Sequence, residues 1–296
     1  NAEEVGSLKN GSIVVSTLNA RANATDVASL ASAGATALAM ELVPRIARAQ
    51  RMDVLSSQAS IAGYKAALLA ANSLGKYLPM MMTAAGTIPP AKILVLGAGV
   101  AGLQAIATAR RLGAIVEAFD VRAAAGEQVE SLGAKFIQPP TAEDAEGAGG
   151  YARAQTEEEQ AAQREFLKGH IADADAVITT AAIPGRPAPL LMTEDMVDVM
   201  KPGSVVIDLA AESGGNVAGT VAGEIINKNG VMINGPINVP SSMPFHASQL
   251  YSRNVMALLD LIIDRKEGTL TIDFEDEVID TMCVAHEGEA RHGLGE

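Results

Sequence analysis

The sequence predicts an α/β protein built around a Rossmann-type, doubly wound parallel sheet, with a second, smaller α/β subdomain. From Lys92 onwards, short apolar runs alternate with segments of helical length, which is typical of buried parallel strands joined by crossover helices. A glycine-rich turn directly follows the first of these runs, "KILVLG". The composition agrees with this fold class, since 48% of the 296 residues are hydrophobic and 28 are glycine.

The chain before Lys92 predicts two strands, two helices and two connecting segments. Strands are expected at residues 12–20 and 36–43, and the second lacks alternation, so it should be buried on both faces. Helical spacing predicts a short helix over 25–32 and a long Ala/Leu helix over 59–78. The polar stretch "PRIARAQRMDVLSSQ" at 44–58 precedes the long helix, and a proline-rich loop at 79–91 follows it.

The chain from Lys92 predicts regular strand–helix alternation. Strands are expected at 92–97, 114–121, 134–137, 175–182, 203–210 and 230–235. Helices are expected at 99–113 and 125–133, and a polar insertion from 139 to about 163 leads into a further short helix. A final helix at 248–264 carries apolar residues at helical spacing and mirrors the helix at 59–78.

Two such helices flanking the doubly wound sheet indicate a hinge pair between two domains. The first subdomain is therefore expected to be discontinuous, formed by residues 1–58 with 243–296. Residues 59–242 are expected to form the second domain, which contains the Rossmann-type sheet.

Composition excludes several classes of function. A formal net charge of -13 argues against a nucleic-acid partner, because phosphate backbones attract basic faces. The four histidines lie in no metal-binding spacing, so no metal is expected. No apolar run approaches the roughly 20 residues needed to span a bilayer, so no direct membrane insertion is expected. The single cysteine, Cys283, is interpreted as a small buried apolar residue.

The strongest local motif is a G-x-G-x-x-G turn formed by Gly97, Gly99 and Gly102 after an apolar strand. Such a turn brings a pyrophosphate to the N-terminus of the following helix. Asp120 ends the next strand, where its carboxylate can accept ribose hydroxyls and repel a 2′-phosphate. This favours NAD(H) over NADP(H), although Arg122 beside it could hold a 2′-phosphate.

The polar stretch and several longer motifs resemble a known family. "PRIARAQRMDVLSSQASIAGY", "FDVRAAAGEQVESLGAKF", "IPGRPAPLLMTEDMVDVMKPGSVVIDLAAESGGN" and "NVPSSMPFHASQLYSRN" resemble the NAD(H)-binding alpha subunit, first domain, of proton-translocating NAD(P) transhydrogenase. The resemblance covers essentially the whole chain. The family's domain begins well before the point where this chain starts, so an N-terminal truncation is expected.

The resemblance implies roles for individual residues. Arg45, Gln50, Asp53 and Ser56 match the residues that hold the nicotinamide and its carboxamide beside an incoming NADP domain, and we treat them as catalytic. The insertion is expected to be a mobile lid hinged at Gly149 and Gly150, in which Tyr151 closes over the nucleotide. Further cofactor contacts are implied at Arg48, Ala49, Val100, Val121, Arg122, Gln163, Thr180 and Ala182.

The family further implies the reaction and the partners. NADH on this chain would pass hydride directly to NADP+ on an NADP(H)-binding domain, and a membrane domain would translocate protons. The chain is also expected to form a homodimer. It would be cytoplasmic in a bacterium and peripheral to the inner membrane through its partners, or on the matrix side of a mitochondrion.

Two alternatives remain open. Alanine dehydrogenase shares the fold and "KPGSVVID", but amine oxidation needs a general acid–base group and a carboxylate anchor. Where that family carries an aspartate before Gly-Gly, this chain has Glu212, which favours the transhydrogenase. The second alternative is a non-catalytic NAD-binding redox sensor, which the glycine turn alone does not exclude.

Overall fold

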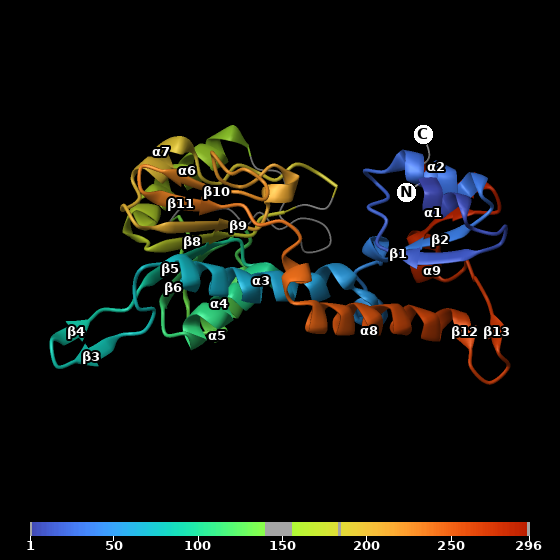
Figure 1. Ribbon diagram of the computed structural model, residues 1–296, viewed down its shortest axis with the longest axis horizontal. Helices are drawn as coiled ribbons and strands as arrows, with labels where there is room; N and C mark the ends of the chain where they lie inside the picture. Colours follow the sequence, from blue (N-terminus) through green and yellow to red (C-terminus); the bar gives the residue numbers. More distant parts are fainter. Residues whose placement is uncertain (1, 140–155, 183–184, 295–296) are drawn as a thin grey trace. The chain divides into compact units, whose positions relative to one another are not determined.

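The computed structural model describes residues 2–139, 156–182 and 185–294, and the chain divides into two compact units (Figure 1). The first unit combines both ends of the chain, Asn1–Gln58 and Phe245–Glu296. The second unit is Ala59–Pro244.

The second unit is built on a seven-stranded sheet that confirms the predicted fold class. The strands follow the order β10-β11-β9-β8-β5-β6-β7, and all neighbours pair in parallel except β10 and β11. Because β8 lies on the opposite side of β5 from β6, the strand order reverses at β5, which is where doubly wound sheets bind ligands. The strands are β5 Lys92–Leu96, β6 Ile115–Phe119, β7 Lys135–Phe136, β8 Ala176–Thr179, β9 Val205–Asp208, β10 Ile225–Lys228 and β11 Val231–Asn234.

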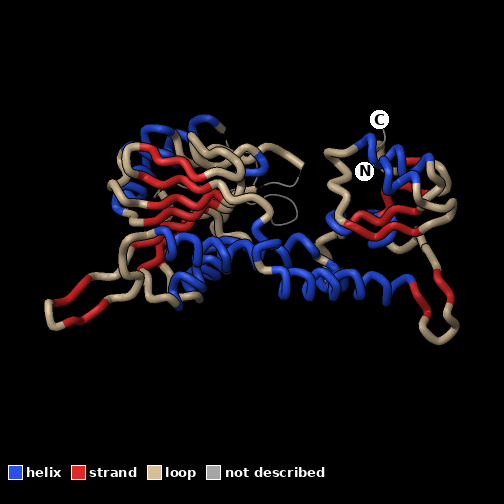
Figure 2. Tube along the Cα trace, viewed as in Figure 1, coloured by secondary structure: helices blue, strands red, loops and turns tan. Residues whose placement is uncertain are grey.

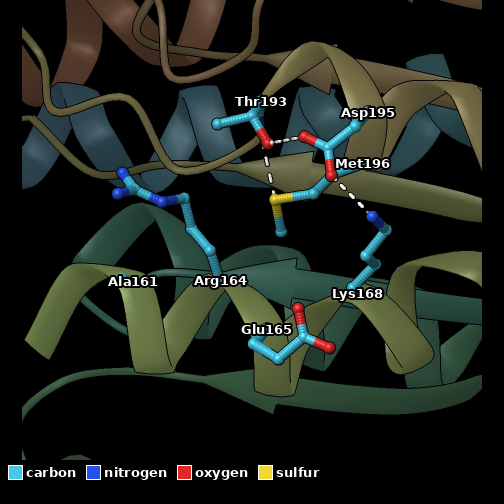
Figure 3. Close-up of a pocket in the computed structure, with 7 residues that line it drawn as sticks. All are labelled: Ala161, Arg164, Glu165, Lys168, Thr193, Asp195 and Met196. Atoms are coloured by element: carbon cyan, nitrogen blue, oxygen red, sulfur yellow. Dashed lines mark hydrogen bonds and ion pairs between the residues drawn. The ribbon is translucent and has the colours of Figure 1, made fainter. Parts of the chain in front are cut away.

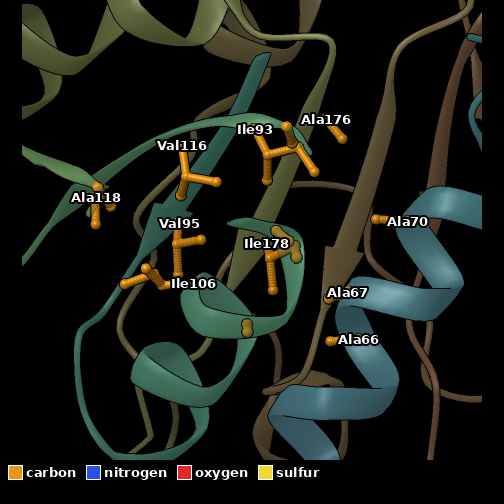
Figure 4. Packing of buried hydrophobic residues seen from close by; sticks show 14 of the residues in the cluster. Ala66, Ala67, Ala70, Ile93, Val95, Ile106, Val116, Ala118, Ala176 and Ile178 are labelled. Atoms are coloured by element: carbon orange, nitrogen blue, oxygen red, sulfur yellow. The ribbon is translucent and has the colours of Figure 1, made fainter. Parts of the chain in front are cut away.

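Helices cover both faces of this sheet (Figure 2). Alternate residues of β5 point to opposite faces, so Ile93 and Val95 join one core cluster and Leu94 and Leu96 another. The first cluster is covered by α3 Val54–Ser73, α4 Val100–Arg111 and α5 Ala125–Ser131, and the second by α6 Glu157–Asp173 and α7 Glu194–Asp198. Figure 4 shows Ala66, Ala67 and Ala70 of α3 in the first cluster, where their small side chains allow close packing.

The first unit contains a four-stranded sheet in which the two chain ends pair. β1 Ile13–Ser16 runs parallel to β2 Thr36–Ala39, and β14 Cys283–His286 pairs antiparallel with β2 on its other edge, followed by β15 Glu289–Ala290. Its helices are α1 Ala2–Gly6, α2 Ala24–Ser32, α8 Pro244–Ile262 and α9 Glu277–Met282. A small hairpin, β12 Ile263–Asp264 with β13 Thr269–Leu270, follows α8.

Cys283 lies in β14 with none of its surface exposed. Burial raises the pKa of its thiol, so the group stays protonated at neutral pH. The interpretation of Cys283 as a buried apolar residue is confirmed.

Several elements differ from the sequence-based expectation, and β10, α7, α9 and β14 were not expected at all. The predicted strand at 36–43 ends at Ala39 and continues as the 3₁₀ helix η1 Met40–Leu42, in which the Glu41 side chain accepts the Leu18 and Ala20 N–H groups at 3.0 and 2.9 Å. The predicted loop at 79–91 contains an antiparallel hairpin, β3 Met81–Thr83 with β4 Gly86–Ile88. Gly86 has φ +123°, a turn conformation that favours glycine.

Two further differences lie at helix starts. The helix α3 begins at Val54, five residues earlier than expected, because the Asp53 carboxylate accepts the Ser56 N–H at 2.9 Å and caps its first turn. The helix α6 is 17 residues long rather than short, and Thr156 and Glu159 form a capping box at its start. Short 3₁₀ helices complete the structure at η2 Ala47–Met52, η4 Ala211–Ser213 and η5 Val239–Ser242.

Candidate functional site

The glycine turn lies at the carboxyl end of β5, at the point where the strand order reverses. Gly97 has φ +102°, which favours glycine. A Cβ at Gly102 would lie 1.8 Å from the Gly97 carbonyl oxygen, so only glycine lets α4 pack this closely on the turn. The local fold therefore requires glycine at both positions.

Gly99 differs from its two neighbours, because a Cβ placed there would meet no atom within 4 Å. It is the N-cap of the 12-residue helix α4 and no side chain caps its first N–H groups. Val100, the first helical residue, is 43% exposed. Open space, free N–H groups and the positive end of a helix dipole together fit a phosphate group.

Asp120 follows β6 at the same edge and is held by Arg122. Its Oδ1 accepts Arg122 N at 2.9 Å and Nε at 2.8 Å, and its Oδ2 accepts Arg122 Nη2 at 2.9 Å and Ala98 N at 2.7 Å. Burial acts to raise the pKa of this carboxyl, but the hydrogen bonds from Arg122 and Ala98 outweigh it, so the pKa lies below its usual value. Asp120 is therefore ionised, and a ribose hydroxyl would have to share it with Arg122.

Gln163 offers an unused acceptor in the same unit. Its side chain is 5% exposed, and its Oε1 has no hydrogen-bond partner. A buried carbonyl oxygen without a donor is costly, so a ligand with an N–H or O–H group would satisfy it. Gln163 is the seventh of the 17 residues of α6, and helices of such folds begin at the carboxyl edge of the sheet.

The segment after β8 is fixed to the glycine turn and to a buried asparagine. The Thr180 hydroxyl donates to the Gly97 carbonyl at 3.0 Å. The Ala181 N–H donates to the Asn216 Oδ1 at 3.0 Å, and the Asn216 Nδ2 donates to the Ala181 and Pro189 carbonyls at 2.8 Å each. Ala182, a predicted contact, is exposed at the end of this fixed segment.

Asn216 is in turn held by Asp208, the last residue of β9, which is completely buried. Its carboxylate accepts five hydrogen bonds, from the Thr179 and Thr220 hydroxyls and from the Ala210, Asn216 and Val217 N–H groups. Sequence reasoning identified neither Asn216 nor Asp208, because neither follows the glycine turn at the spacing that marks Asp120.

The polar stretch forms part of the first unit. Its middle part is the six-residue 3₁₀ helix η2, followed by Asp53 and the start of α3. The Ser56 hydroxyl donates to Asp53 Oδ2 at 2.6 Å, so the structure brings these two predicted residues together. Arg45 and Gln50 are exposed, whereas Ala49 is completely buried and serves as a packing residue of η2.

Arg48, a predicted cofactor contact, is paired with a carboxylate of the first unit. Its Nη1 and Nη2 donate to Asp276 Oδ2 and Oδ1 at 2.9 and 2.6 Å. Asp276 also caps α9 through the Val278 N–H. This paired geometry gives Arg48 a structural role in holding η2 against α9.

A cleft of about 610 Å³ in the first unit contains three of the predicted residues. Gln50, Asp53 and Ser56 line it together with Arg51 and Ser57 and with four residues of α8, namely Leu250, Arg253, Asn254 and Met256. Their side chains offer hydrogen-bond donors and acceptors of several kinds, as a carboxamide requires. The motif "NVPSSMPFHASQLYSRN", most of which lies in α8, was part of the family resemblance, but none of these four residues was predicted as a site residue.

A second cleft, of about 360 Å³, lies between α6 and α7 in the second unit (Figure 3). Lys168 Nζ lies 2.6 Å from Asp195 Oδ2 across it, and the Thr193 hydroxyl donates to Asp195 Oδ1. None of its lining residues belongs to the glycine turn or follows the carboxyl end of a parallel strand. We therefore assign no nucleotide contact to this cleft.

Some predictions fall beyond what the structure covers. Gly149, Gly150 and Tyr151, and with them the expected lid, lie outside the described residues. Within the ranges that the structure does describe, no group of histidine, cysteine or carboxylate side chains could hold a metal ion. No helix within those same ranges has the length and apolarity to cross a membrane.

Comparison with known proteins covers both units. Residues 1–62 match the family described as alanine dehydrogenase/PNT, N-terminal domain, and residues 66–293 match its C-terminal domain. The chain is 50% identical over 292 residues to the first section of the NAD(P) transhydrogenase alpha subunit of Rhodospirillum rubrum, a match that spans 98% of this chain and 76% of that relative.

A solved structure and a more distant relative complete the comparison. The crystal structure of transhydrogenase from Sinorhizobium meliloti is 49% identical, with a TM-score of 0.89, and the match covers 98% of this chain and 78% of that one. Alanine dehydrogenase of Mycobacterium tuberculosis is 31% identical over 222 residues, 74% of this chain and 54% of that relative.

Proposed function

Because the chain belongs to the alanine dehydrogenase/PNT family, and within it to the NAD(P) transhydrogenase alpha subunits, we propose that it binds NAD(H) and exchanges hydride directly with NADP(H) held on a partner domain. The reaction NADH + NADP+ → NAD+ + NADPH moves one hydride, with its two electrons, and releases no proton. The nicotinamide supplies this redox chemistry. The protein's task is binding and orientation.

In the second unit, the residues at the reversal point of the sheet would hold the dinucleotide. The Gly99 opening and the first turn of α4 fit its phosphates. Asp120 offers an ionised acceptor for a ribose, and the orphaned Gln163 Oε1 offers an acceptor for a ligand N–H or O–H. Arg122 is already bonded to Asp120, so it is not free to grip a 2′-phosphate, which favours NAD(H).

In the first unit, the polar segment would orient the nicotinamide carboxamide. A carboxamide presents two N–H donors and one carbonyl acceptor. The Asp53–Ser56 pair supplies acceptors for the donors, and Gln50 and Arg45 supply donors for the carbonyl. Several converging hydrogen bonds are what a hydride donor needs for a fixed geometry.

The observation that carries this proposal is the chemistry of the 610 Å³ cleft. The described residues that line it include no histidine and no lysine. Their one carboxylate, Asp53, accepts hydrogen bonds from both the N–H and the hydroxyl of Ser56. Oxidising an amine would require a group that removes a proton, whereas hydride exchange between two nicotinamides requires none. The cleft is rich in orienting groups and poor in acid–base groups, which suits hydride exchange.

The test mixes the chain with a transhydrogenase NADP(H)-binding domain, adds NADH and an NADP+ analogue, and follows reduction of the analogue by absorbance. We expect reduction only when both proteins are present. L-Alanine with NAD+ is the matched control, and turnover in that control would support the alanine dehydrogenase alternative instead.

A further inference from the structure

A buried asparagine from the opposite end of the chain holds the polar segment in place. Asn254 lies in α8, is 6% exposed and lines the 610 Å³ cleft. Its Nδ2 donates to the Arg51 carbonyl at 2.8 Å, and its Oδ1 accepts the Ser57 hydroxyl at 2.7 Å. One amide thus contacts both η2 and the first turn of α3.

The Arg51 carbonyl needs a hydrogen-bond donor from outside its own helix. It lies in the last turn of η2, where carbonyl groups have no donor within the helix. The neighbouring Gln50 carbonyl accepts the Asp53 N–H, which closes the turn, while the Arg51 carbonyl accepts from Asn254. The Asn254 bonds to the Arg51 carbonyl and to the Ser57 hydroxyl hold the chain on either side of Asp53 and Ser56.

The orientation of the amide is determined by its two partners. A serine hydroxyl can donate to the amide oxygen, and a backbone carbonyl can only accept from the amide nitrogen. Of the uncharged side chains of this length, only asparagine offers both a donor and an acceptor in this arrangement. The Gln58 Nε2 adds a second link between the helices by donating to the Ala247 carbonyl at 3.3 Å.

We infer that Asn254 is a positioning residue for the candidate nicotinamide site. It sets the backbone that carries Gln50, Asp53 and Ser56, without itself being assigned a contact to the reacting atoms. This inference rests on the proposed function for its effect on rate, but the anchoring of Arg51 stands independently of it. Small displacements of an orienting group lower the rate of transfer far more than they lower binding.

The anchoring is tested by limited trypsin digestion, because trypsin cleaves the Arg51–Met52 bond at the carbonyl that Asn254 holds. We expect Asn254→Ala to be cut after Arg51 about five- to tenfold faster than the wild type. Cleavage after Arg265, an exposed arginine in the β12–β13 turn, is the internal control and should not change. An unchanged rate after Arg51 would overturn the inference.

The effect on function is tested with the same variant. At saturating NADH, with the NADP(H)-binding domain and NADP+ analogue present, single-turnover transfer should fall roughly 10- to 100-fold. The NADH Kd should change by less than about threefold, a split that general loss of structure would not produce. Faster cleavage after Arg51 combined with a wild-type rate of hydride transfer would overturn the positioning role. Equal losses in the transfer rate and in NADH affinity would overturn it as well.

Two further variants and one charge control keep the test decisive. If Asn254→Ala does not fold, Ser57→Ala removes the bond to Asn254, together with the hydroxyl's contacts to the Val54 carbonyl and Gln58 Nε2, and should show the same split to a smaller degree. Asn254→Asp retains the acceptor but loses the donor, and Asn10→Asp adds the same charge at an exposed asparagine of the same unit. A wild-type chain that transfers no hydride would contradict the proposed function, and cleavage after Arg51 would then decide the anchoring alone.

Discussion

The Arg122 guanidinium is bonded twice to the Asp120 carboxylate, through Nε to Oδ1 at 2.8 Å and through Nη2 to Oδ2 at 2.9 Å. The pair lies just after β6, in the position where a dinucleotide-binding fold recognises a ribose. Asp120, which favours NAD(H), thus restrains Arg122, which could have favoured NADP(H).

Arg122→Ala should sharpen the discrimination between the two nucleotides. Without the guanidinium, the Asp120 charge is no longer compensated, and repulsion of a 2′-phosphate increases. We expect NADPH affinity to fall by about tenfold and NADH affinity to stay within about threefold, measured by fluorescence titration. Asp120→Asn is the companion variant, and it should bind NADH roughly tenfold more weakly. If Arg122→Ala bound NADPH as tightly as the wild type, the assigned role of the pair would be incorrect.

Gly99→Ala and Gly102→Ala should separate binding from folding. The Cβ added at Gly102 would meet the Gly97 carbonyl oxygen at 1.8 Å, so the free energy of unfolding should fall by at least about 3 kcal/mol. The Cβ added at Gly99 has open space, so stability should change by less than about 1 kcal/mol while NADH affinity falls at least tenfold. Urea unfolding and NADH titration of both variants provide the check. Wild-type affinity in Gly99→Ala would place the phosphates elsewhere.

Asn216→Asp should destabilise the second unit. The change removes the donor that serves the Ala181 and Pro189 carbonyls and buries a second carboxylate close to Asp208. We expect a loss of about 3 kcal/mol, which lowers Tm by roughly 6–12 °C in a unit of this size. Thr220→Val, which removes one of the five donors to Asp208, should cost about 1 kcal/mol. An Asn216→Asp protein with the wild-type Tm in calorimetry would show that this network does not stabilise the strand ends.

Asp175→Asn should reveal a pH-dependent contribution at the amino edge of the sheet. Burial acts to raise the pKa of the Asp175 carboxyl, but bonds from Lys76 at 2.5 Å and from the Lys92 N–H at 3.0 Å outweigh it, so the pKa lies below its ordinary value of 3.8. A lowered carboxyl pKa stabilises the fold above the ordinary value, and that stabilisation is lost as pH falls through the lowered one.

The variant should therefore be less stable than the wild type by about 1–3 kcal/mol at pH 7, with a difference that shrinks progressively below about pH 4. Urea unfolding at a series of pH values measures this difference. Asp26→Asn, at an exposed position, is the control. A difference that stayed constant down to pH 2 would mean that the ion pair does not control the effect.

The sequence was sufficient for the parts of the fold that depend on local pattern. Buried strands such as β5 and β9 are short aliphatic runs, and the glycine turn has a fixed spacing, so both could be located without tertiary contacts. The α3 start was missed because an N-cap from Asp53 competes with the apolar pattern that begins later. The β3–β4 hairpin was missed because a methionine and alanine run between prolines has no clear strand signal.

The long-range contacts that hold the polar segment in place could not be predicted, and the reason is different. Asn254 contacts the Arg51 carbonyl 203 positions earlier in the chain, and Arg48 bonds to Asp276 across 228 positions. Asparagine and arginine occur in many environments, and their type does not specify a distant partner. Such contacts follow only once the two chain ends meet in one sheet through β2 and β14.

The most direct test of the central claim follows the hydride itself. NADH carrying deuterium at the transferred position is mixed with the chain, a transhydrogenase NADP(H)-binding domain and NADP+, and the NADPH formed is analysed by mass spectrometry. The account predicts that NADPH carries the deuterium undiluted, because the hydride passes between the two nicotinamides without exchange with water. Unlabelled NADPH, or no NADPH when both proteins and both nucleotides are present, would contradict it.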